Sequence, residues 1–127
     1  MSAADDEEET QQPEPEEKQP IPVIFHQTSK GNEPVRKWLK ELPDEVRRAV
    51  GGDIWLLQRE WPVGKPLVDG FGDGLYEVRT EIDKNIYRVL FCFSEETIVV
   101  LHSFQKKTMK TPKQDVELAR KRQKEHK

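Results

Sequence analysis

Three stretches rich in β-branched and aromatic residues follow one another along the chain with only short polar breaks between them. They are Leu75 to Thr80, Ile86 to Phe93 and Thr97 to Phe104, with polar breaks at Asp83-Lys84-Asn85 and Ser94-Glu95-Glu96. Consecutive strands that are joined by short polar turns form an antiparallel meander. The middle stretch is apolar on both faces, so we expect it to lie in the centre of the sheet.

The residues before this meander predict a strand and a helical hairpin. Val23 to Phe25 is predicted to form a first strand. A helix follows, with Asn32 or Ser29 as its cap, Pro34 in its first turn and an apolar stripe at helical spacing that begins at Val35. Pro43 ends this helix and starts a second one, which runs to Trp61 and which the pair Gly51-Gly52 weakens.

A strand around Pro66 to Phe71 precedes the meander, and a basic helix follows Pro112. We therefore expect one α+β domain, in which an N-terminal helical hairpin packs on an antiparallel twisted sheet and a helix ends the chain.

Charge divides the 127 residues into a tail and a body. Residues 1–20 carry eight acidic groups against the single base Lys18, a net −7, and because the whole chain is −3 the remainder carries +4. Residues 1–21 offer almost nothing to bury, so they are predicted to be a disordered acidic tail on a domain formed by residues 22–127. Two roles remain open for this tail. It keeps the chain soluble, or it folds back over a basic site, where its carboxylates mimic RNA phosphate.

Cysteine content and hydropathy indicate the compartment. Cys92 is the only cysteine, which excludes an intrachain disulfide and fits a reducing environment, and its apolar neighbours predict a buried position. The chain has no apolar stretch of membrane-spanning length, and its N-terminus is acidic where a signal peptide would be basic. We expect a cytoplasmic protein.

Strand alternation places charged side chains on one face of the sheet. If Thr80 pairs with Asn85 across a four-residue loop, Glu77 lies opposite Arg88, and Arg79 shares their surface. Two interpretations remain open: a solvated face with an ordinary ion pair, or a functional surface.

A basic run leaves the last predicted strand. Residues 104–127 carry nine bases and three acids, a balance that attracts phosphate, and Phe104 offers a ring on which an unpaired base can stack. The alternative for Arg120 to Lys127 is a lysine-rich, solvated end of the chain.

Three segments in this order resemble the RelE/HigB-type toxins of the RelE/ParE superfamily, and most of all their phage-derived branch. They are Leu75-Tyr76-Glu77-Val78-Arg79, Ile86-Tyr87-Arg88-Val89-Leu90-Phe91 and Val100-Leu101-His102-Ser103-Phe104-Gln105-Lys106-Lys107-Thr108, the last followed by Lys110-Thr111-Pro112. The resemblance runs from about Val23 to Arg122. It implies a compact sheet against a helical hairpin, cleavage of mRNA in the ribosomal decoding site, and neutralisation by an antitoxin that is often a helix-turn-helix protein.

The resemblance also implies a metal-independent mechanism and a set of site residues. A ribose 2′-hydroxyl attacks the adjacent phosphate while fixed cations stabilise the charge that builds on its oxygens. Arg79, Arg88, Lys106 and Lys107 are the candidate catalytic residues, and Lys65, Phe104, Lys110 and Lys113 are the candidate RNA-binding residues. Within the first set, Lys106 is the candidate base and Arg88 the candidate stabiliser of the transition state. No metal or other cofactor is expected.

The histidines do not complete this mechanism. Several family members carry a catalytic tyrosine or histidine near the C-terminus, whereas no tyrosine follows Tyr87 here. His126 is predicted to lie in a frayed tail, His26 has no assigned place, and alternation puts His102 on the face of Ile98, Val100 and Phe104 as a core histidine. Their spacing does not suggest zinc, and the proton donor has no candidate.

Two other functions fit the same residues. The missing C-terminal acid group also suits a non-enzymatic ParE-like inhibitor of DNA gyrase. A non-catalytic module that binds RNA or an antitoxin needs only the basic surface. The interpretation as an endoribonuclease that inhibits translation rests on Arg79 and Arg88 lying beside Lys106.

Overall fold

The computed structural model describes residues 19–107 and 110–126. Its helices are α2 (Pro34–Glu41), α3 (Asp44–Glu60), α4 (Lys113–Gln123) and the short 3-10 helix η1 (Lys124–His126). Its strands are β1 (Val23–Phe25), β2 (Val68–Gly72), β3 (Leu75–Ile82), β4 (Asn85–Ser94) and β5 (Thr97–Lys106). The α+β class and the order of elements are as expected, and most of the predicted acidic tail lies outside the described residues.

The five strands form one sheet in the order β1-β5-β4-β3-β2, with β4 in the centre as predicted. The expectation of a purely antiparallel sheet is wrong, because β1 pairs with β5 in parallel. Backbone bonds extend this pairing at both ends, from His26 N–H to Val100 O and from Ile98 N–H to Pro22 O. A three-residue strand gives no sequence signal for its direction, which depends on where the intervening helical hairpin returns the chain.

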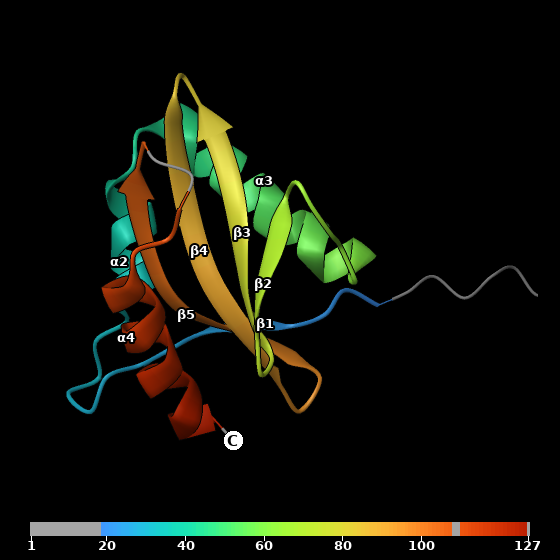
Figure 1. The fold of residues 1–127 in the computed structure, drawn as a ribbon, viewed down its shortest axis with the longest axis vertical. Coiled ribbons are helices and arrows are strands. Elements are labelled where there is room, and N and C mark those ends of the chain that lie inside the picture. Colours follow the sequence, from blue (N-terminus) through green and yellow to red (C-terminus); the bar gives the residue numbers. More distant parts are fainter. Residues whose placement is uncertain (1–18, 108–109, 127) are drawn as a thin grey trace, which may run out of the picture.

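Helices cover both faces of the sheet (Figure 1), with α3 behind it and α4 in front of it. Buried residues of α2 and α3 pack on the side chains of one sheet face, including Val78, Val89 and Phe91. A smaller cluster on the opposite face joins Leu90 and Cys92 to α4. Cys92 is buried as predicted, and burial raises the pKa of its thiol to about 11.

The β3–β4 hairpin turns more tightly than expected. Ile82 pairs with Asn85, so that only Asp83 and Lys84 form the loop, both with positive φ. This backbone conformation is the one that two-residue hairpin turns require. The predicted pairing of Thr80 with Asn85 is therefore wrong, although the correct register differs from it by an even number of residues. An even shift leaves every side chain on its predicted face.

Helix boundaries agree with the prediction better than the caps do. The expectation that Asn32 or Ser29 caps α2 is wrong, because Glu33 occupies the N-cap and makes no side-chain cap bond. The Asn32 N–H instead donates to the Thr28 hydroxyl at 3.1 Å, within the preceding turn. The next helix, α3, runs unbroken from Asp44 to Glu60 through its two glycines.

A pair of histidines fastens the C-terminal end to β1. His26 is buried, and its Nδ1 lies 2.9 Å from Nε2 of His126. The Ser94 hydroxyl donates to the carbonyl of His126 at 2.5 Å. The expectation of a frayed end at His126 is wrong, since contacts with β1 and β4 hold it.

We expect the stability of the fold to decrease in acid through His26. Burial lowers the pKa of His26, and Glu125 opposes this effect. A lowered pKa means that the unfolded chain binds the proton more tightly, so stability is complete above the unfolded value of about 6.5 and decreases as the pH falls below it, by at most about 1.4 kcal/mol per pH unit. Urea unfolding between pH 8 and 5 should show a steeper loss for the wild type than for His26→Gln. Parallel curves for the two proteins would contradict this expectation.

Candidate active site

The α4 side of the sheet carries the predicted site residues of strands β3, β4 and β5 in two adjacent rows. Across β3, β4 and β5, Arg79 pairs with Arg88, and Arg88 pairs with Phe104. In the adjacent row, Ile86 pairs with Lys106. Since Ile86 and Arg88 lie on the same face of β4, alternation places Lys106 on the face of the two arginines. The sheet therefore does not separate these cations.

Arg88 is fully buried, with 0% of its side chain exposed. Its Nη1 donates to the Thr111 hydroxyl at 2.8 Å and lies 3.5 Å from Oε1 of Glu77, which is also 0% exposed. The Thr111 hydroxyl donates in turn to the other carboxylate oxygen of Glu77 at 2.5 Å. Burial lowers the pKa of Arg88, and the charge of Glu77 raises it. The interpretation of this face as a solvated surface with an ordinary ion pair is wrong at these two residues.

Arg79 connects the buried pair to the edge of the sheet. Its Nε donates to Glu77 at 2.7 Å, and its Nη2 donates to Asp69 of β2 at 3.2 Å. Asp69 also lies 3.7 Å from the ammonium group of Lys65. Positive and negative groups therefore alternate from Lys65 to Arg88, and each carboxylate has a cation on either side. Arg79 keeps 16% of its side chain exposed, whereas Arg88 and Glu77 have none.

A β-bulge changes the place of His102. The register shifts between Leu90 and Phe91, so that His102 pairs with Leu90 and lies on the α4 face, the face opposite to that of Val100. The prediction that His102 shares a face with Val100 is wrong, because a bulge shifts the alternation by one residue. Nε2 of His102 lies 2.7 Å from Oδ1 of Asp115 in α4, so the ring has a partner inside the fold, as expected of a core histidine.

The ring of Phe104 lies between two other groups. Its centroid is 5.6 Å from that of the His102 ring, and the guanidinium carbon of Arg88 lies 5.9 Å from it. The ring is partly exposed. It therefore covers the buried arginine from the β5 side and still offers a surface to a ligand.

The predicted lysines near the end of β5 and the start of α4 are exposed. Lys106 is the last residue of β5, Lys107 follows it, and both are exposed. Lys110 is exposed just before Thr111, and Lys113 in the first turn of α4 lies 3.8 Å from Glu117. Thr108 and Met109, which complete the basic run, lie outside the described residues.

Sequence reasoning did not identify Thr111 as a functional residue. Its contacts with Arg88 and Glu77 join residues 23 and 34 positions apart along the chain, which no local pattern encodes. The one available signal was its place in the Lys110-Thr111-Pro112 motif.

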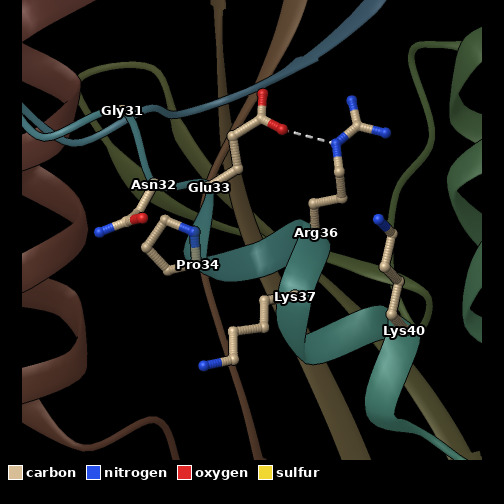
Figure 2. A pocket seen from close by; sticks show the side chains of 7 residues that line it. All are labelled: Gly31, Asn32, Glu33, Pro34, Arg36, Lys37 and Lys40. Atoms are coloured by element: carbon tan, nitrogen blue, oxygen red, sulfur yellow. Dashed lines mark hydrogen bonds and ion pairs between the residues drawn. The ribbon is translucent and has the colours of Figure 1, made fainter.

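A basic hollow of about 560 Å³ lies elsewhere, at the start of α2. It is lined by Gly31, Asn32, Glu33, Pro34, Arg36, Lys37 and Lys40. Figure 2 shows Arg36 and Lys40 extending to one side of the helix and Lys37 to another, and Arg36 is paired with Glu33 at 2.7 Å. Because these cations do not point toward one common position, and because no predicted site residue lines the hollow, we do not assign the site there.

A metal site and a membrane-spanning helix each have requirements with which the described part of the chain can be compared. Across residues 19–107 and 110–126, no group of three or more His, Cys, Asp or Glu side chains is placed to hold a metal ion. No helix in these ranges combines the length and the hydrophobicity needed to cross a membrane.

Residues 37–124 match the family model described as phage-derived protein Gp49-like (DUF891). The chain belongs to the Gp49-like family. This is a family of RelE-like toxins, so the predicted relation to a phage-derived toxin branch is confirmed, and such a family implies an antitoxin partner. No curated protein matches the chain.

The Gp49-like match contains every predicted site residue, since these run from Lys65 to Lys113. It begins within α2 and ends at Lys124, the first residue of η1, and it leaves out β1 and His26. The match does not distinguish a HigB toxin from other members of the family.

Proposed function

We propose that this Gp49-like protein is the toxin of a toxin–antitoxin pair and cuts mRNA on the ribosome without a metal ion, while an antitoxin of the helix-turn-helix type restrains it. The observation that carries the proposal is the common face of Arg79, Arg88 and Lys106, in which Glu77 and Thr111 fix the buried arginine. A transition state that gains charge on phosphate oxygens is stabilised by cations that are already in place.

Because Arg88 is buried, we assign different roles to these cations. Arg88 is enclosed, so we assign it the role of holding Glu77, which in turn orients Arg79. The Nη1 of Arg79 makes no hydrogen bond within the described residues, and we assign it to a phosphate oxygen. Lys106 and Lys107 supply further positive charge from the end of β5, and Lys65, Lys110 and Lys113 contact the RNA backbone around them.

The proposed reaction is a transesterification. The ribose 2′ oxygen forms a bond to the adjacent phosphorus while the bond from phosphorus to the 5′ oxygen breaks. The 5′ oxygen takes a proton from water, so the products are a 2′,3′-cyclic phosphate and a 5′ hydroxyl. Lys106 takes the proton from the 2′ oxygen. Phe104 holds an unpaired base by stacking.

Induction of the protein in bacteria tests this proposal. The wild type should arrest growth and produce new mRNA ends within codons, whereas Arg79→Ala combined with Lys106→Ala should do neither. Arrest with intact transcripts would contradict the proposal. DNA breaks and a damage response before any loss of translation would indicate a gyrase inhibitor instead.

One observation favours a second candidate, a module that binds RNA or an antitoxin without cutting. Both arginines of the site have carboxylate partners, and Arg88 has no exposed surface through which to touch a phosphate. Harmless overexpression together with salt-dependent RNA binding would support this candidate.

A further inference from the structure

The outer side of α3 carries exposed apolar residues. Trp55 is 46% exposed and Leu56 is 39% exposed, although the opposite side of the same helix is buried in the core. Both side chains border a hollow of about 290 Å³, which Gly52, Arg59 and Glu60 complete. Adjacent exposed apolar side chains around a depression are typical of a protein contact surface.

The glycines of α3 shape this surface. Gly51 and Gly52 lie in the interior of the helix, where each costs about 1 kcal/mol relative to alanine. A Cβ atom added at either position would meet nothing within 4 Å, so packing inside the fold does not require these glycines. Gly52 instead affects the outer surface of the helix, because its missing side chain leaves room for a bulky group between Trp55 and Leu56.

The charge around the hollow indicates what kind of partner fits. Arg48 lies one turn before Gly52, and Arg59 lies one turn after Trp55, on the same side of the helix. Neither arginine has an ion pair among the described residues, and the guanidinium of Arg59 lies 5.9 Å from the centroid of the Trp55 ring. At about 1.5 Å per residue, the two cations are separated by roughly 16 Å along the axis.

We infer that this side of α3 docks an acidic amphipathic helix of a partner protein. A bulky apolar residue of that helix occupies the hollow over Gly52, and carboxylates about three turns apart pair with Arg48 and Arg59. The inference does not depend on nuclease activity, because α3 and the proposed site lie on opposite sides of the sheet.

The acidic N-terminal segment of the chain fits this surface less well. Its charge is suitable, and the chain enters the fold beside α3, where Ile21 and Gln58 exchange hydrogen bonds. However, the apolar side chains of residues 2–18 are those of two alanines and two prolines, so this segment lacks a large apolar side chain to fill the hollow.

Two synthetic helical peptides of 18 residues test the inference with the full chain. Both carry leucines along one side, and they differ in having either glutamate or lysine at two positions eleven residues apart. We expect the glutamate peptide to bind at least tenfold more tightly by calorimetry, with a blue shift of Trp emission that Trp55→Phe removes. Gly52→Leu and Arg59→Glu should each weaken binding at least tenfold, whereas Lys121→Glu on α4 should change it less than twofold.

Thermal unfolding of each variant shows whether binding is lost because the docking surface changed or because the fold was lost. Replacing Gly52 with leucine improves helix propensity, so its thermal midpoint should stay level or rise while binding is lost. Arg59→Glu should in addition prefer the lysine peptide. Equal affinity for the two peptides, or unchanged affinity in Gly52→Leu, would overturn the inference. Acrylamide quenching that is the same for the free wild type and Trp55→Phe would overturn it too, because it would mean that another part of the chain or a second copy already covers Trp55.

Discussion

Replacing Arg88 with methionine should destabilise the fold by about 3–5 kcal/mol and abolish RNA cleavage. Methionine fills much of the space but leaves the carboxylate of Glu77 buried next to the Thr111 hydroxyl, with Arg79 as its remaining cation. A buried charge that loses a partner is costly at this scale. The free energy of unfolding in urea measures the first effect, and mapping of RNA ends after induction measures the second.

A second substitution separates the two effects. Glu77→Gln removes the buried charge that has lost one of its two cations, so the double variant with Arg88→Met should regain most of the lost stability. It should remain inactive, since Arg79 then lacks the carboxylate that orients it. A loss below about 1 kcal/mol in Arg88→Met alone would contradict the buried ion pair, and recovery of cleavage in the double variant would contradict the positioning role.

Strand alternation could predict which residues share one face of the sheet, but it could not predict which of them are buried there. Alternation placed Glu77, Arg79 and Arg88 together, and an error of an even number of residues in the hairpin register did not disturb that result. The same alternation could not show that Arg88 is enclosed. Its partner Thr111 is 23 residues away along the chain, so their contact is long-range.

Local irregularities account for the other differences. The bulge at Leu90 and Phe91 moves His102 to the α4 face, where it meets Asp115 instead of the helical hairpin core. No sequence pattern marks that extra residue, because Val100 and Leu101 are both apolar and both buried. The parallel pairing of β1 and the contact between His26 and His126 are likewise long-range, so they depend on the complete chain path.

The site has buried residues and exposed residues, and substitutions in the two groups test different things. Arg88 and Glu77 are buried, and changes there alter the fold together with any activity. Lys106 is exposed at the end of β5, so changes there act on activity with little effect on the fold. Lys113 is a suitable comparison, because it is also a lysine, its side chain is 90% exposed and, among the described residues, its ion pair is with Glu117.

Replacing Lys106 with alanine should reduce single-turnover RNA cleavage by about 10²–10⁴-fold, the usual contribution of a general base. Stability should change by less than about 0.5 kcal/mol, as is usual for an exposed position. Lys113→Ala should keep cleavage within about threefold of the wild type, because it removes a cation that our proposal places only at the RNA backbone.

Lys106→Arg distinguishes a base from a simple positive charge. Arginine retains the charge and the reach of lysine but cannot give up its proton near neutral pH. If Lys106 removes the 2′ proton, Lys106→Arg should be nearly as inactive as Lys106→Ala while it binds RNA as tightly as the wild type. Cleavage by Lys106→Arg within tenfold of the wild type would instead assign Lys106 to phosphate binding, and a different group would have to act as the base.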